Sequence, residues 1–234
     1  CWLRDRRLLR RMILVDLKID ETRCDPLLDR ITRHPDHAAM TAWLIGGGAR
    51  SQYTGEKIGD YDFVFKDMKS LVLFRKIIRD VGAKKVSETF SNDRTRMTCE
   101  DFVLRYGEEQ HEYVYIQMKY EFYERVDVQL NTADFTVCQF YMQLGNEVKL
   151  GATAQAIEDY NNKHLRIHRM LMPMSTLQRI PKFVARGFVP WNNVKFYQDI
   201  IRRIREAPEQ AITVGTEPKG KRYKKDWKDE FNIP

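Results

Sequence analysis

The most informative stretch of the sequence is Gly46-Gly47-Gly48-Ala49-Arg50, which is followed after nine further residues by Asp60-Tyr61-Asp62. Successive glycines let the backbone approach a ligand closely, because no Cβ atom stands in the way. In a strand, side chains at positions i and i+2 leave the same face, so Asp60 and Asp62 would project together. The two motifs predict a phosphate-binding turn beside a pair of carboxylates.

Asp60 and Asp62 begin a segment that is otherwise apolar. Tyr61, Phe63 and Phe65 would pack behind the carboxylates, which indicates a buried strand; a solvated turn is the alternative. Mg²⁺ takes oxygen ligands and commonly bridges carboxylates to substrate phosphates. Two such ions about 4 Å apart can hold the attacking and leaving oxygens of a phosphoryl transfer. We therefore expect a magnesium site here.

A third carboxylate is expected at Asp127. The segment Arg125-Val126-Asp127-Val128-Gln129-Leu130 alternates between apolar and polar residues, which predicts a strand over 125–131 with Asp127 facing away from the apolar side chains. An ordinary half-buried strand with a solvent-facing acid is the alternative. Glu121 and Glu124 are nearby competitors with less regular apolar flanks. We predict that Asp60, Asp62 and Asp127 are the catalytic, metal-binding acids.

The glycine cluster follows a short apolar run, Trp43-Leu44-Ile45. If a helical turn starts near Ala49, its free N–H groups and the positive end of its dipole would attract a phosphate. Tight turns explain most glycine clusters, so the spacing to Asp60 is what favours the phosphate interpretation.

These residues carry a family resemblance. Gly46 to Arg50, Gly55 and Asp60-Tyr61-Asp62-Phe63 resemble, without a gap, the G-G-x-x-R…G…D-x-D signature of tRNA nucleotidyltransferases and bacterial poly(A) polymerases, members of the DNA polymerase β-like superfamily. A second block, Ala133 to Cys138, is similar to the family's R-R-D-F-T-I-N. A fainter third block, Ile157 to Tyr160, Leu165-Arg166 and Arg179 to Phe188, resembles the helical neck. The resemblance covers about residues 40–190.

The resemblance implies an α+β fold, in which a small mixed β-sheet nucleotidyltransferase head is flanked by helices and followed by an α-helical C-terminal annex. It also implies a Mg²⁺-dependent enzyme that moves a nucleotidyl group from an NTP such as ATP to a hydroxyl, with an RNA 3′ end, as in tRNA processing, as the leading acceptor. Asp134 would lie near the sugar, and Arg50 and Lys182 would contact phosphate. The implied nucleotide-binding residues are Gly46, Gly47, Gly48, Arg50, Asp134, Arg179 and Lys182.

The sequence departs from the family pattern in three places. Ser51 replaces an Asp, Thr132-Ala133 replace paired arginines, and Met172 to Thr176 replace the E-D-x-x-R that reads the base. These departures argue against CCA addition specifically. One alternative is a catalytically inactive nucleotidyltransferase-like subunit with a structural or RNA-binding role in a larger assembly. Another is a transferase that modifies a protein or a small molecule.

Composition and charge set further limits. The chain has 234 residues, 43% of them apolar, and a net charge of +7. This is enough for one catalytic domain with a helical annex. No apolar run is long enough to cross a bilayer, so we expect no membrane span. Positive charge gathers at both ends and predicts RNA binding there, with a solvated tail or a protein-binding arm as the alternative. The residues are Arg4, Arg6, Arg7, Arg10, Arg11, Lys219, Lys221, Arg222, Lys224, Lys225 and Lys228.

The cysteines and the first residue bear on localisation. Cys1, Cys24, Cys99 and Cys138 form no Cys-x-x-Cys pair, so the sequence predicts neither a zinc ribbon nor a disulfide framework. A reducing intracellular compartment, cytoplasm or organelle matrix, is expected. Because the chain begins with Cys1 and not with Met, we expect any targeting signal to be missing from it.

The expected organisation has four parts. Residues 1–38 form an Arg-rich arm that is helical at first and broken by Pro26 and Pro35. The catalytic domain spans 39–150, a helical neck-like annex broken by Pro181 and Pro190 spans 151–214, and a basic tail spans 215–234. Within the catalytic domain, spacing predicts a helix over 67–81 closed by Gly82, strands near 101–106 and 112–119, and a helix over 135–144 that Asp134 could cap.

Overall fold

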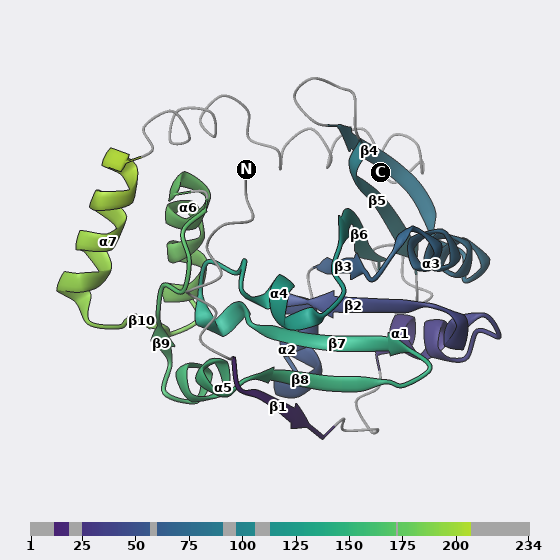
Figure 1. Ribbon diagram of the computed structural model, residues 1–234, viewed down its shortest axis with the longest axis horizontal. Helices are drawn as coiled ribbons and strands as arrows, with labels where there is room; N and C mark the ends of the chain where they lie inside the picture. The colour runs from purple at the N-terminus through teal and green to yellow at the C-terminus, as the bar shows by residue number, and fades with distance from the viewer. Residues whose placement is uncertain are drawn as a thin grey trace.

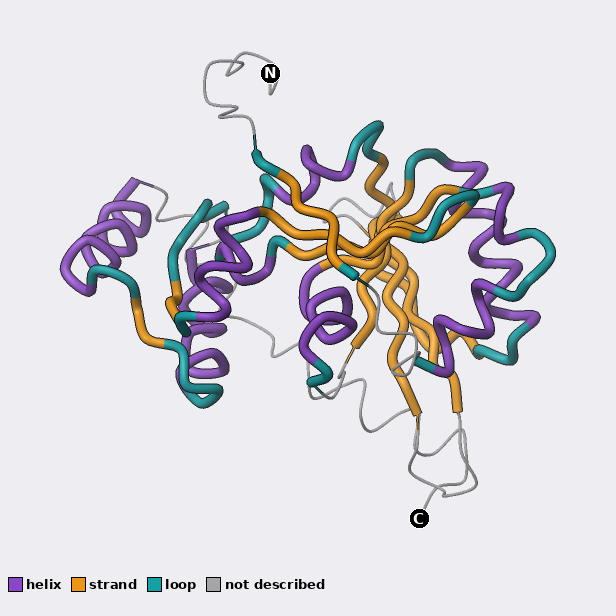
Figure 2. The backbone as a smooth tube through the Cα atoms, turned by 90° about the horizontal axis from the view of Figure 1, so that it is seen from below, coloured by secondary structure: helices purple, strands orange, loops and turns teal. Residues whose placement is uncertain are grey.

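The computed structural model describes residues 12–18, 25–56, 60–90, 97–105, 113–171 and 173–206. Helices and strands alternate irregularly along the chain around one large sheet (Figures 1 and 2). This confirms the predicted α+β class, although the sheet has eight strands, in the order β1-β8-β7-β2-β3-β6-β5-β4, and is larger than expected. The arginine-rich start and the basic tail, over 1–11 and 207–234, lie outside the described residues.

The strand that carries the paired acids lies inside the sheet. Neighbouring strands of the eight-stranded sheet are antiparallel except β3 and β6, which are parallel. Asp62 on β3 pairs with Ile45 on β2 and with Gln117 on β6, so both edges of β3 are hydrogen-bonded. The strands are Leu14–Leu17 (β1), Thr41–Ile45 (β2), Asp60–Phe65 (β3), Lys84–Phe90 (β4), Met97–Arg105 (β5), Tyr113–Phe122 (β6), Phe140–Gly145 (β7) and Lys149–Thr153 (β8).

The helices flank this sheet. They are Pro26–Thr32 (α1), Gly46–Thr54 (α2), Met68–Asp80 (α3), Val126–Leu130 (α4), Ala154–Asn161 (α5), Pro173–Val184 (α6) and Asn193–Glu206 (α7). Short 3₁₀ turns cover His37–Ala39 (η3) and Thr136–Cys138 (η4), and His164–Leu165 (β9) pairs with Val189–Pro190 (β10). The helix predicted over 67–81 is confirmed as α3, where Asp67 caps the first turn and Gly82, with φ +99°, follows the last. No helix of the described residues is long and apolar enough to cross a membrane.

Three apolar clusters hold these elements together. The largest packs α1, α2, α3 and α5 against one sheet face and contains Tyr61, Phe63 and Phe65, all fully buried as predicted. Val64 points to the opposite face, where it joins Val126 and other side chains. A third cluster joins η4 to α6 and α7, which Figure 1 shows at the opposite end of the molecule from α3. Each fully buried large apolar side chain contributes about 1.5–3 kcal/mol.

Two findings bear on the expected N-terminal arm. Leu14–Leu17 is a strand that pairs with β8, so part of the expected arm belongs to the sheet. Pro26, where a break was expected, begins α1, because proline fits the first turn, where its missing N–H has no partner to lose.

Three expected elements are also corrected. Residues 126–130 form a helix and not the predicted strand, because Val126 and Leu130 are four residues apart and share a helix face as well as a strand face. The helix predicted over 135–144 is η4 followed by β7, whose residues are almost all buried on both faces and therefore show no clear period. The helix α6 continues through Pro181 and ends three residues later, at Val184, so this proline costs one backbone hydrogen bond and does not divide the helix.

Candidate active site

Asp60 and Asp62 stand at the start of β3 and leave the same sheet face. Tyr61 and Phe63, which alternate with them, are fully buried on the other face. Asp60 is exposed and Asp62 is partly exposed, but both lie in the wall of a cavity, where the surrounding protein keeps part of the water away from their carboxylates. The buried rings fix the strand, so the two carboxylates are held together at the accessible side of the sheet.

The three glycines form the first turn of α2. The helix starts directly after Ile45, the cross-strand partner of Asp62, and no side chain caps it. Its first N–H groups therefore lack helical acceptors, and together with the helix dipole they favour an anion. The helix begins three residues before the expected Ala49. Burial of Gly48 to Ser51 offsets the poor helix propensity of glycine.

The space around the glycines differs along the turn. A Cβ atom at Gly46, which has φ +65°, or at Gly47 would meet no atom of the described residues within 4 Å. A Cβ atom at Gly48 would lie 2.8 Å from Leu44 Cδ1. A side chain at Gly48 would therefore crowd Leu44, whereas the space above Gly46 and Gly47 is open to a ligand.

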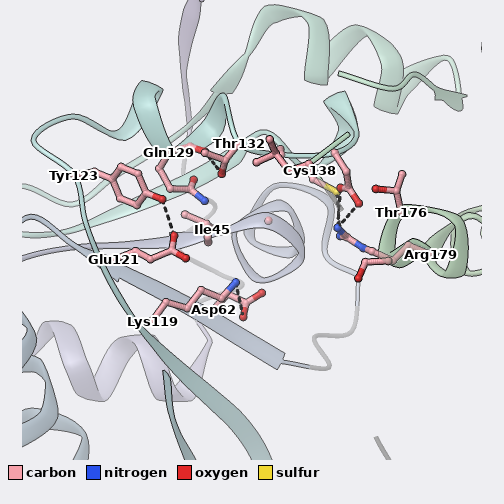
Figure 3. A pocket seen from close by; sticks show the side chains of 15 residues that line it. Ile45, Asp62, Lys119, Glu121, Tyr123, Gln129, Thr132, Cys138, Thr176 and Arg179 are labelled. Carbon is pink, nitrogen blue, oxygen red and sulfur yellow. Dashed lines mark hydrogen bonds and ion pairs between the residues drawn. The ribbon is translucent and has the colours of Figure 1, made fainter. Parts of the chain in front are cut away.

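Two adjoining cavities open beside these elements. The larger, of about 590 Å³, runs from Gly46, Asp62 and Lys119 to Asp134, Thr176 and Arg179 (Figure 3). The smaller, of about 350 Å³, is lined by Gly47, Asp60 and Lys182 among others. Asp62, Lys119, Cys138 and Arg179 line both. Cavities of this size are typical of small-molecule sites.

The electrostatics around the two acids favour a cation. The surrounding protein raises the pKa of Asp60 by desolvation, and the neighbouring Asp62 carboxylate raises it further, against the opposing charges of Lys182, Lys119 and Arg179. Lys119 Nζ lies 3.3 Å from Asp62 Oδ1. Two carboxylates that repel each other on one sheet face fit the oxygen donors that Mg²⁺ takes, with phosphate and water completing its coordination.

The prediction that Asp127 completes a three-acid site is wrong. Asp127 lies on α4, where its two carboxylate oxygens accept from Arg125 Nε at 3.0 Å and Nη2 at 2.6 Å, and it lines neither cavity. In the part of the chain that the structure describes, no three His, Cys, Asp or Glu side chains are grouped so as to hold a metal ion. The competitor Glu121 does line the larger cavity, where it accepts from Tyr123 Oη at 2.6 Å (Figure 3).

Arg50, a predicted phosphate contact, is only 2% exposed. Its Nη1 donates to the Val137 carbonyl at 3.0 Å, and its Nη2 lies 3.6 Å from Glu56 Oε2. The buried Nε has no hydrogen-bond partner among the described residues. Arg50 thus ties α2 to η4 and places a positive charge in the wall of the smaller cavity.

Asp134 and Arg179, both predicted to bind nucleotide, bind each other. Arg179 Nη1 lies 2.7 Å from both Asp134 oxygens, and Nη2 lies 3.4 Å from Cys138 Sγ (Figure 3). Asp134 Oδ1 also accepts from the amide of Phe135, at the start of a 3₁₀ turn and strand in place of the expected helix. The pair lines the larger cavity, and Lys182, further along α6, lines the smaller one.

Lys119 and Gln117 are cavity residues that sequence reasoning missed. Along β6, Gln117, Lys119 and Glu121 alternate with side chains of the opposite face, of which Ile116 and Met118 are fully buried. That alternation is visible in the sequence. The parallel pairing of β6 with β3, which brings its polar face beside Asp62, is not a local signal.

Comparison with known families gives one match. The family described as "Gad2: Gabija anti-defense 2 family protein" matches residues 20–163, more than half of the chain and including both α2 and β3. A search of curated proteins finds no match.

Comparison with solved structures finds CCA-adding enzymes. A complex with ATP is 18% identical, with a TM-score of 0.58 over 88% of this chain and 48% of that one. A complex with CTP is 19% identical, with a TM-score of 0.57 over 83% and 45%. A Thermotoga maritima enzyme complexed with tRNA is 18% identical, with a TM-score of 0.53 over 82% and 46%. The chain has a nucleotidyltransferase-like fold, as its motifs predict, and spans about half the length of these enzymes.

Proposed function

The chain belongs to the Gabija anti-defense 2 family, and we propose that it is a nucleotidyltransferase that moves a nucleotidyl group from an NTP to a hydroxyl acceptor. The observation that carries the proposal is the pair Asp60 and Asp62 beside the uncapped start of α2, at the junction of two cavities. Enzymes of the same fold that are described as complexes with ATP and with CTP support it by analogy.

The triphosphate would lie against the start of α2. The amides of Gly46 and Gly47 would donate to phosphate oxygens, since nothing in the described residues fills the space above them. Lys182 and the buried charge of Arg50 would stabilise the pyrophosphate that leaves when the acceptor oxygen bonds to the α-phosphorus. These groups are fixed by α2 and α6, so they need little rearrangement during the transfer.

Asp60 and Asp62 would hold Mg²⁺. The raised pKa of Asp60 supports this role, because a cation between the two carboxylates would relieve both their repulsion and the cost of their desolvation. When bound, the ion would neutralise triphosphate charge and orient the reacting phosphate. Asp62 would also position the nucleotide, because its carboxylate faces both cavities.

An RNA 3′ end is the acceptor we propose. A similar fold is described in complex with tRNA, and the chain carries a net charge of +7, which favours a polyanion. The family description names Gabija anti-defense. We infer that the transfer reaction serves to counter that defence.

The test is incorporation of each labelled NTP by the purified chain, with RNA, protein and water as acceptors. We expect Mg²⁺-dependent transfer to RNA, and we expect Asp62→Asn to reduce it by at least about 100-fold, since it removes a direct ligand. Asp127→Asn is the matched control, because Asp127 pairs with Arg125 outside both cavities, and it should leave the rate within about twofold. Undiminished transfer by the Asp62→Asn protein would refute the assignment.

A second candidate is a catalytically inactive nucleotidyltransferase-like protein that binds nucleotide or RNA. The observation that favours it is the Arg125 partner of Asp127, which leaves the proposed metal site with two acids among the described residues. The same assay separates the candidates: nucleotide binding without incorporation into any acceptor would support the inactive protein.

A further inference from the structure

Lys119 occupies an unusual position for a positive charge in the proposed metal site. Its Nζ lies 3.3 Å from Asp62 Oδ1, and its charge also acts on Asp60. It projects from β6, two residues beyond the register partner of Asp62, and it lines both cavities. Figure 3 shows Lys119 and Asp62 joined to each other, and Arg179 held separately beside Cys138.

Two nearby cations are held by other partners. Arg179 binds Asp134 and Cys138, and Arg50 donates to the Val137 carbonyl. Lys119 differs, because its partner is the acid that the proposed function assigns to the metal. An ammonium and a divalent ion cannot share one carboxylate closely without strong repulsion, so one must move when the other enters.

Lys119 is able to move. Its side chain is 29% exposed, and a lysine has a flexible four-carbon stem with three rotatable donors. Because the residue lines the larger cavity as well as the smaller one, its ammonium can leave Asp62 and still face the space beside Gly46.

We propose that Lys119 is an internal counter-cation that neutralises Asp62 in the metal-free protein, leaves it when a divalent ion enters, and then binds the triphosphate. This inference rests on the proposed function for the identity of the ligand. The charges of Asp60, Asp62 and Lys119 favour an order of binding in which the divalent ion enters before the triphosphate. Two carboxylates and one ammonium carry one net negative charge, and addition of a divalent ion makes this group of three side chains net positive, which strengthens the attraction of the site for a triphosphate.

The first test measures Mn²⁺ binding by electron paramagnetic resonance in the absence of nucleotide. Lys119→Met should bind Mn²⁺ about tenfold more tightly than the unchanged protein, because a competing charge is removed. Lys119→Arg should bind Mn²⁺ with nearly the affinity of the unchanged protein, because it keeps the positive charge. It therefore separates the effect of charge from the effect of side-chain shape. Lys149→Met is the matched control, because Lys149 is also a strand lysine in an ion pair, with Glu147 at 2.8 Å, but lines neither cavity. Equal or weaker Mn²⁺ binding by Lys119→Met would overturn the proposal.

The second test measures, by calorimetry at saturating Mn²⁺, how tightly the protein binds a non-hydrolysable ATP analogue. Lys119→Met should bind the analogue roughly tenfold more weakly, the loss expected for one charge-assisted contact. Unchanged affinity would overturn the movement of Lys119 to the triphosphate. If the unchanged protein binds Mn²⁺ and the analogue but transfers no nucleotide, the proposed reaction fails while the role of Lys119 stands. If it binds neither, both fail.

Discussion

Asp159 offers the sharpest test of how the helical annex is held to the site. Its side chain is 0% exposed. Oδ2 accepts from Arg166 Nε at 3.0 Å and from the Thr136 hydroxyl at 2.5 Å, and Oδ1 accepts from Arg166 Nη2 at 3.2 Å. This one carboxylate therefore joins α5 to η4, next to Asp134 and Cys138 in the cavity wall. We expect Asp159→Asn to destabilise the whole annex.

The size of the effect follows from burial. Removal of one partner of a buried ion pair costs about 3–5 kcal/mol, because the other charge is left unpaired. The Arg166 side chain is 29% exposed, so water can solvate part of its charge and the lower end, about 3 kcal/mol, applies. For a domain of this size each kcal/mol lowers the melting temperature by about 2–4 °C. The expected loss is about 6–12 °C.

The assay is thermal unfolding followed by circular dichroism at pH 7.5. Glu158→Gln is the matched control, since Glu158 is the preceding acid of the same helix and its side chain makes one exposed contact, with Gln155 at 3.1 Å. It should change stability by less than about 0.5 kcal/mol. Asp159→Asn combined with Arg166→Met should recover part of the loss, because no unpaired charge remains. If Asp159→Asn melts within about 2 °C of both the unchanged protein and the control, the reasoning is refuted.

Two further predictions concern the site itself. Gly47→Ala should keep or slightly raise the melting temperature, because the new Cβ meets no described atom within 4 Å and alanine favours the helix by up to about 1 kcal/mol, yet it should weaken NTP binding in calorimetry; unchanged affinity would contradict a phosphate at this turn. Asp60→Asn should raise the melting temperature at pH 8, since a carboxylate whose pKa is raised in the folded protein costs stability when charged. That gain should vanish below the ordinary Asp pKa of 3.8, where the group is protonated in both states, and a lower melting temperature at pH 8 would contradict the sign.

The central part of the site was predictable because its signals are local. The alternation of Asp60 and Asp62 with buried aromatic residues has one period only, that of a strand, and the structure contains that strand. The helix α3 was predictable for the same reason: Asp67 caps its first turn, and its apolar spacing is sustained over three turns.

Other parts of the fold and the site depend on tertiary contacts, which a local sequence pattern does not predict. Val126 and Leu130 fit both a strand and a helix, and only the 46% exposure of Val128 on α4 separates the two. The pairing of β1 with β8 joins segments more than 130 residues apart. The position of Lys119 follows from the parallel pairing of β6 with β3, which also depends on tertiary structure.

Three local features of the site would each destabilise the protein if no ligand were involved. The start of α2 has no capping side chain, which forgoes about 1 kcal/mol. Gly47 lies in its first turn, where alanine would favour the helix by up to about 1 kcal/mol and packing does not require glycine. Asp60 is held near Asp62 at a raised pKa. A bound cation would relieve the repulsion between the two carboxylates. A phosphate bound to it would accept from the free amides of α2, and it could approach them closely only where no side chain covers the backbone. Because these features converge on one pair of cavities, a shared ligand explains them better than three unrelated defects.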